Sequence, residues 1–159
     1  MRSKTRPGRT TAAATGDVVV FLIGMRINHF WAVHRWLPVF LAMPRMLREL
    51  SRDPSSGLLS YQLLSGSPKT YYVVEYWESK EKLLAYAAAP DKLHRPEWAK
   101  INRYLRKSRQ HVGIWHETYV VPEGSYESIY GDMPPYGLGK AYGVAPLGDG
   151  VQAAERLAA

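Results

Sequence analysis

Cysteine is absent from the 159 residues of the sequence. The chain therefore has no disulfide framework, no cysteine-ligated zinc or iron–sulfur centre and no cysteine nucleophile. A run of about 20 apolar residues that could span a bilayer is missing too, because the longest candidate, residues 18–23, leads directly into Gly24-Met25-Arg26. We expect a cytoplasmic protein that has no membrane partner.

Acidic residues are scarce relative to basic ones, with 14 Asp and Glu against 21 Lys and Arg and a formal net charge of +7. Four basic residues, Arg2, Lys4, Arg6 and Arg9, lie within the first nine positions, and the other 17 exceed the 14 acidic residues by only three. The remainder is thus mildly basic, which argues against a nucleic-acid partner. Residues 1–16 are predicted to be a disordered basic head.

Aromatic side chains are abundant, with eleven Tyr and five Trp. A chain of this length forms one domain with one core, and filling that core usually takes fewer large aromatic residues. We therefore expect a cavity lined by aromatic side chains, and a small molecule as its ligand.

Hydrophobic periodicity predicts four strands and three helices. The expected elements are, in chain order, a strand at 18–27, an amphipathic helix at 36–52, strands at 58–65 and 70–77, a helix capped by Ser79, a helix opened by Pro96 and a strand at 112–121. Pro44 removes an internal hydrogen bond and is expected to kink or split the first helix. The order is that of a ferredoxin-like βαββαβ domain, an α+β fold.

The predicted sheet has one face covered by helices and one bare face. Two such sheets hide their bare faces when they pack together, so the pattern predicts a homodimer that forms a dimeric α+β barrel. Residues 17–121 make up this barrel domain. An irregular, extended C-terminal arm at 122–145 is expected to lie over the partner subunit or the cavity mouth, and 146–159 to form a flexible tail.

Alternation along the first strand separates two kinds of side chain. Val19 and every second residue after it are apolar and suit the helix-covered face, whereas the other set becomes polar at Arg26 and Asn28. We expect Arg26 and Asn28 to point into a cavity, where the Asn28 amide would orient a substrate oxygen or bound O2.

Residues 75–98, EYWESKEKLLAYAAAPDKLHRPEW, resemble the signature of the antibiotic-biosynthesis monooxygenase superfamily, in which a strand ends in a Tyr-Trp-x-Ser sequence and a His follows the next helix. The matching residues here are Tyr76, Trp77, Ser79 and His94. Together with the segments GMRIN, WLPVF, MLREL and MPPYGLGKA, the resemblance extends to a subfamily that includes an oxygenase of fumagillin biosynthesis.

The resemblance implies oxygenase chemistry. Some superfamily members oxidise polyketide or terpenoid intermediates with only O2 and an activated substrate, and others degrade haem. The haem-degrading members use an Asn at the end of the first strand, a Trp at the end of the third and a His just after the second helix as the axial ligand, and Asn28, Trp77 and His94 occupy the matching places. A cofactor-independent reaction and a haem b cofactor therefore both stay open.

Each candidate residue also has a purely structural interpretation. His94 either ends the second helix or acts as a ligand or acid–base group. Trp77 either fills the core or forms a platform for substrate. His116 is a core histidine unless it faces the barrel, where it would accept a substrate proton. Burial of Glu75 would raise its pKa into the range of a useful base.

We predict a small-molecule oxygenase that acts on a hydrophobic or aromatic, secondary-metabolite-type substrate, with His94, His116 or Glu75 removing a proton. A haem-binding enzyme with His94 as axial ligand is one alternative. A non-catalytic ligand-binding dimer is another. No metal site is expected, because His29 and His34 do not share a helical face and no third ligand is evident.

The predicted bare sheet face makes the oligomeric state testable. Light scattering at micromolar concentration should give twice the chain mass of 18.0 kDa, because an isolated subunit would expose the apolar face. A mass of one chain would contradict the dimeric barrel.

Overall fold

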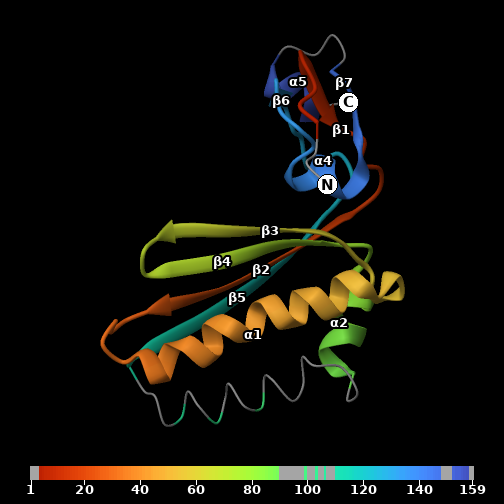
Figure 1. Ribbon diagram of the computed structural model, residues 1–159. Coiled ribbons are helices and arrows are strands. Elements are labelled where there is room, and N and C mark those ends of the chain that lie inside the picture. Colours follow the sequence, from red (N-terminus) through yellow and green to blue (C-terminus); the bar gives the residue numbers. More distant parts are fainter. Residues whose placement is uncertain are drawn as a thin grey trace.

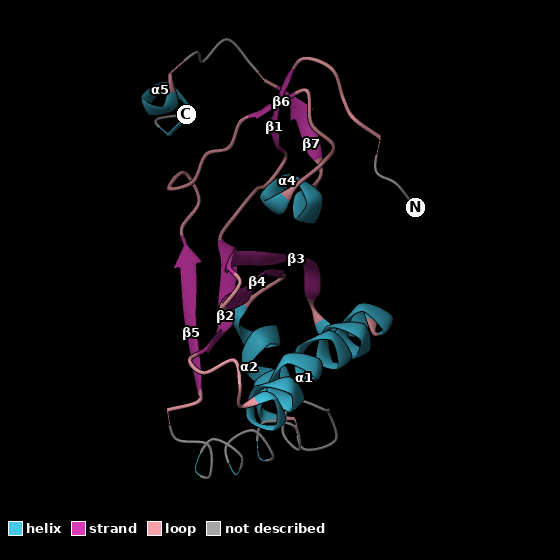
Figure 2. Cartoon of the chain, turned by 60° about the vertical axis from the view of Figure 1, so that its left-hand side comes forward, coloured by secondary structure: helices cyan, strands magenta, loops and turns pink. Residues whose placement is uncertain are grey.

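The computed structural model describes residues 4–89, 99, 103, 106, 110–147 and 152–157. It contains a four-stranded and a three-stranded antiparallel sheet. Figure 1 shows helices α1 and α2 on one side of the larger sheet, and the smaller sheet with α4 on the other. The turned view in Figure 2 shows the same arrangement of layers.

The larger sheet has the strand order β3-β4-β2-β5. Its strands are β2 at Val18–Ile27, β3 at Leu58–Ser67, β4 at Thr70–Trp77 and β5 at Val112–Val121. β2, β4 and β5 have the boundaries expected from the sequence, and β3 extends two residues further. The two central strands are β2 and β4, and the chain runs from β2 through a helix and the edge strand β3 to β4. This connection confirms the ferredoxin-like α+β fold.

Helix α1 runs without interruption from Val33 to Arg52, with Pro38 and Pro44 inside it. Of the two outcomes expected for Pro44, a kink or a split, the split is wrong. Five buried residues hold the helix against the sheet, and this packing outweighs the hydrogen bonds that the prolines remove; they are Val39, Ala42, Met46, Leu47 and Leu50.

Two shorter helical elements follow, one after α1 and one after β4. A 3-10 turn, η1 at Pro54–Ser56, comes after α1, and α2 occupies Lys80–Ala88. The Ser79 side chain accepts a hydrogen bond from the Lys82 amide at 3.2 Å, so the predicted cap is confirmed. Of the helix expected to open at Pro96, only Ala99, Arg103 and Arg106 are described, and all three are helical. No helix in the described ranges is long and apolar enough to cross a membrane.

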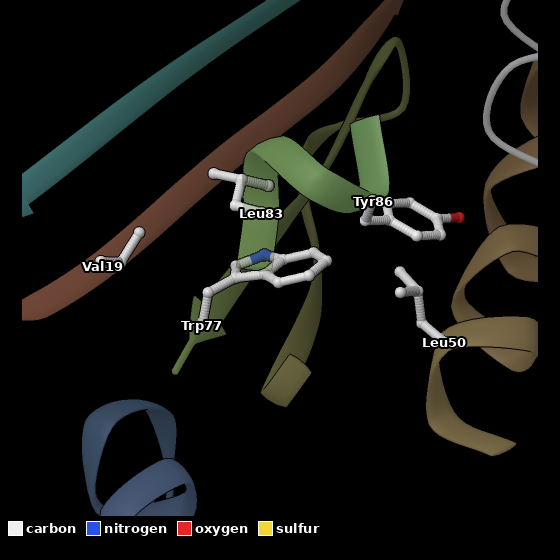
Figure 3. Packing of buried hydrophobic residues seen from close by; sticks show 5 residues of the cluster. All are labelled: Val19, Leu50, Trp77, Leu83 and Tyr86. Carbon is white, nitrogen blue, oxygen red and sulfur yellow. The ribbon is translucent and has the colours of Figure 1, made fainter. Parts of the chain in front are cut away.

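The core lies between the helices and one face of the larger sheet. Figure 3 shows one of its clusters, in which Trp77 lies among Val19, Leu50, Leu83 and Tyr86. Val19 is on the apolar set of the first strand, so the predicted assignment of that set to the helix-covered face is confirmed. Side chains of the alternate set, such as Val20 and Leu22, therefore point to the opposite face.

The smaller sheet joins the two ends of the chain, with β1 at Arg9–Ala12 between β6 at Tyr130–Gly131 and β7 at Val144–Pro146. The prediction of a disordered head is therefore wrong at residues 9–12, since strands from the arm satisfy its backbone. The Ser128 hydroxyl also accepts a hydrogen bond from the Ala12 amide at 2.9 Å. Likewise, the tail predicted to be flexible contains helix α5 at Ala153–Leu157, whose residues favour helix.

The arm also contacts the larger sheet through α4, at Gly137–Tyr142. The Lys140 ammonium donates a hydrogen bond to the Tyr61 carbonyl at 3.2 Å, and a Cβ added to Gly137 would lie 3.2 Å from the Tyr76 hydroxyl oxygen. The arm is thus ordered against its own sheet. Contact with a partner subunit stays a prediction.

Because β1 lies between β6 and β7, the head should hold the arm in place. Deletion of residues 1–13 should increase the rate of tryptic cleavage after Lys140, as β6 and β7 lose their shared neighbour. Limited proteolysis followed by mass spectrometry would measure this rate. Deletion of residues 1–5, which precede β1, is the control, and equal rates in both truncated chains would contradict the role of β1.

Candidate functional site

Two adjoining pockets lie between the helices and the helix-covered face of the larger sheet. The first, of about 220 Å³, is lined by Glu75, Trp77 and His116 among others, and we call it the Glu75 pocket. The second, of about 230 Å³, lies between α1 and strands β2 to β4, and we call it the apolar pocket. The two pockets have Ile23, Met43 and Met46 as common wall residues. In the single chain, then, the described cavities lie on the helix side of the sheet and not on the face expected to line a barrel.

Glu75 is a carboxyl group within the core. It lies in the middle of β4 opposite Phe21 of β2, and only 4% of its surface is exposed. Burial raises the pKa of Glu75 from 4.5 to about 7, although the hydrogen bond from Trp77 lowers it in part. Near neutral pH this group therefore exists as a mixture of acid and carboxylate, as a general base or acid requires.

Trp77 orients this carboxyl group. Its indole Nε1–H donates a hydrogen bond to Oε2 of Glu75 at 3.0 Å, two residues away on the same face of β4. The ring is 1% exposed and its centroid lies 5.8 Å from that of Tyr86. The core-packing interpretation of Trp77 thus holds, and the same packing fixes the donor that Glu75 uses.

Tyr86, on α2, is a wall residue whose polar end the sequence did not single out. Its hydroxyl donates a hydrogen bond to Oε2 of Glu49 on α1 at 3.3 Å. Burial, and then the nearby Glu49 carboxylate, raise the pKa of Tyr86, so the phenol stays protonated. Its partner on α1 follows only from the packing of the two helices.

His116 enters the Glu75 pocket from β5. It pairs with Ile23 and so lies on the helix-covered face, while Glu117 lies on the opposite face. His116 therefore does not face the barrel, the position in which we expected it to accept a substrate proton. Its ring is exposed and lies 5.8 Å from the Phe21 ring. Two strand spacings of about 4.8 Å separate β4 from β5, and β2 with its Phe21 side chain lies between them.

Arg26 and Asn28 lie at the other end of the sheet. Trp77 pairs with Val19 near the start of β2, and Thr70 pairs with Arg26 near its end. Asn28 is nine residues beyond Val19, a distance of about 30 Å along an extended strand. The resemblance to haem-degrading enzymes implies one site shared by Asn28, Trp77 and His94, and that expectation is wrong for Asn28 and Trp77, because antiparallel neighbours end at opposite edges. Instead, Asn28 accepts a 2.8 Å hydrogen bond from the Arg26 guanidinium.

His94, the third residue expected at that site, lies outside the described residues. The described part of the chain holds no group of three or more His, Asp or Glu side chains arranged to bind a metal ion. Near Asn28, however, the rings of His29 and His111 lie 5.1 Å apart beside Trp31. No local pattern signals this pair, because His29 follows the end of β2 and His111 precedes the start of β5, and the two residues meet only because these strands pair.

The sequence model of the family described as "Monooxygenase af470-like" matches residues 18–138. Over 134 residues the chain is 34% identical to Monooxygenase af470 of Aspergillus fumigatus, covering 79% of this chain and 46% of that protein. The chain thus spans about half the length of this curated relative.

Two solved structures illustrate the fold. An aldoxime dehydratase crystallised with butyraldoxime has a TM-score of 0.64 at 15% identity, over 85% of this chain and 43% of the enzyme. SnoaB, a cofactor-independent oxygenase from Streptomyces nogalater, has a TM-score of 0.47 at 14% identity, over 67% of this chain and 95% of that chain. At 15% identity, the likeness to the dehydratase concerns the fold alone.

Burial of Glu75 should make stability depend on pH. Between pH 4.5 and about 7 the folded chain retains a proton on Glu75 that the unfolded chain releases. The free energy of unfolding should therefore fall as pH rises, by up to roughly 3 kcal/mol in all, and level off above the folded pKa. Urea unfolding of the wild type and Glu75→Gln from about pH 5 to about pH 8 measures this difference.

The side-chain amide of the Glu75→Gln variant can still accept the Trp77 hydrogen bond but cannot ionise, so the variant should lack this part of the pH dependence. Glu117→Gln, at an exposed position, is the matched control and should follow the wild type. Parallel curves for the wild type and Glu75→Gln would contradict the raised pKa.

Proposed function

The chain belongs to the Monooxygenase af470-like family, and on this premise we propose that it is an oxygenase that uses Glu75 as a base toward a hydrophobic small molecule. The observation that carries the proposal is a buried carboxyl group, with its pKa raised to about 7, in the wall of an otherwise largely apolar pocket. The relative that is named a monooxygenase supports the reaction class.

Proton removal is the first step. Trp77 holds Oε2 of Glu75, and Oε1 takes a proton from a substrate C–H that neighbouring carbonyl or aromatic groups have made acidic. The apolar walls exclude water, so the carboxylate is a stronger base than it would be in solution. The substrate becomes a resonance-stabilised carbanion, and its negative charge replaces that of Glu75.

Reaction with O2 completes the oxygenation. The carbanion gives one electron to O2, and the resulting radical and superoxide combine into a peroxide anion at carbon. Glu75 returns its proton to this anion, and loss of water from the hydroperoxide leaves a carbonyl group. The overall change, R2CH2 + O2 → R2C=O + H2O, balances without another reductant, since the substrate supplies all four electrons.

His116 is proposed to connect this chemistry to solvent. Its ring lines the Glu75 pocket and is itself exposed. An imidazole in such a position can carry protons between bulk water and the reacting carbon. Trp77 is proposed to act on the substrate through Glu75, as a positioning residue, because its indole N–H is already bound to the carboxyl group.

Substrate-binding roles for Arg26 and Asn28 belong to a different part of the molecule, five and seven residues beyond Phe21, which pairs with Glu75. The haem alternative rested on Asn28, Trp77 and His94 acting together. The separation of Asn28 from Trp77 argues against that set, and the role of His94 as an axial ligand remains a prediction. We therefore favour the cofactor-independent reaction.

Substitution of the proposed base provides the test. Glu75→Gln should lower the turnover number about 10²-fold or more, because the amide cannot take the substrate proton. In the wild type, kcat/KM should rise with pH through about 7 and then level off, since only the carboxylate is active. Oxygen uptake with dithranol, an anthrone with an activated CH2 group, measures both quantities.

Glu117→Gln is again the control, because Glu117 lies on the opposite face of the sheet. His116→Gln should slow turnover less than Glu75→Gln, because water can also carry protons at an exposed position. Full activity of Glu75→Gln with an unaltered pH profile would reject Glu75 as the base.

A further inference from the structure

We propose that the substrate has two parts. The substrate head carries the acidic C–H bond that reacts beside Glu75, and the substrate tail is a hydrocarbon chain that lies in the apolar pocket. This inference rests on the proposed function for the head alone. The tail is inferred from the shape and chemistry of the second pocket, which contains none of the groups that we propose to react.

The two pockets are continuous enough for one molecule to occupy both. Ile23 of β2 and Met43 and Met46 of α1 form part of the wall of each. Two of these three residues are methionines, whose unbranched side chains adapt to ligands of different shape. A substrate seated beside Glu75 therefore has a direct path past these side chains into the apolar pocket.

The second pocket suits a hydrocarbon. Among the described residues its walls contain no carboxylate, imidazole, Lys or Arg, and they include Val39, Phe40, Leu63 and Tyr71. The Tyr71 hydroxyl already donates to the Pro68 carbonyl at 3.0 Å, and its ring contacts that of Phe40 with centroids 5.1 Å apart. A polar group placed there would lose its hydration without gaining a partner, which selects for an apolar chain.

The sizes of the pockets agree with a divided ligand. The apolar pocket is about 230 Å³ and the Glu75 pocket about 220 Å³, so neither is a minor extension of the other. Leu63, which is 55% exposed on the edge strand β3, stands at the rim of the apolar pocket. A tail longer than the pocket would reach solvent at Leu63.

A homologous series of 1,3-diketones with straight alkyl tails tests the inference, each member one methylene longer than the last. The dicarbonyl head is a carbon acid, and absorbance of its enolate reports proton removal, while calorimetry gives the dissociation constant. Affinity should rise by up to about fourfold for each methylene added and then stop rising when the apolar pocket is full.

Two variants narrow the apolar pocket without touching the Glu75 pocket. Val39→Phe adds volume from α1, and Leu63→Trp adds it at the exposed rim, where the fold tolerates a larger side chain. Both should reduce the tail length at which affinity stops rising, and weaken the longest members about tenfold or more. Leu59→Trp, an exposed position of the same strand that lines neither pocket, is the matched control and should bind like the wild type.

The possible results test the substrate tail and the substrate head independently. Glu75→Gln should abolish enolate formation yet retain the dependence of affinity on tail length. Enolate formation that survives Glu75→Gln would reject the proposed function and leave the tail pocket standing. Affinity that does not change with tail length in the wild type, or that Leu63→Trp and Leu59→Trp alter alike, overturns the inference, as does failure of every member of the series to bind.

Discussion

The pairing of β2 with β4 is the constraint on which the rest of the structure depends. Because side chains alternate between the faces of a strand, the register of Phe21 with Glu75 and of Val19 with Trp77 places all four beneath the helices. A shift by one residue would put the carboxyl group on the opposite face, in reach of water. The same register also fixes the ends of the sheet, and so separates Trp77 from Asn28.

Glu75 shows how this constraint buries an ionisable group at a cost to stability. A carboxyl group that shares a pocket wall with Leu50, Leu83 and Trp77 loses hydration that one indole hydrogen bond only partly replaces. The raised pKa expresses that loss. An apolar residue at position 75 would pack in the same space without this penalty, and the proposed proton transfer would account for a carboxyl group in the core.

The smaller sheet adds a second layer of organisation. β1 belongs to the N-terminal head and β6 and β7 to the C-terminal part of the chain, so the two ends of the chain form one sheet together. Their union holds α4 on the side of the larger sheet that the helices leave open, where Tyr76 approaches Gly137. The bare face is thereby covered in part by the chain itself, which leaves a smaller area for a partner subunit than a ferredoxin-like domain alone would present.

The sequence by itself determined the elements of the barrel domain. Alternation gave β2, β4 and β5 with correct boundaries, and Ser79 marked the start of α2, because these signals depend on neighbours within a few residues. It also indicated that burial would raise the pKa of Glu75. The tertiary structure alone decided that His116 shares a pocket with Glu75, that Asn28 does not, and that residues 9–12 form a strand. Each depends on which distant segments pair, and on their register, which no local pattern along one strand encodes.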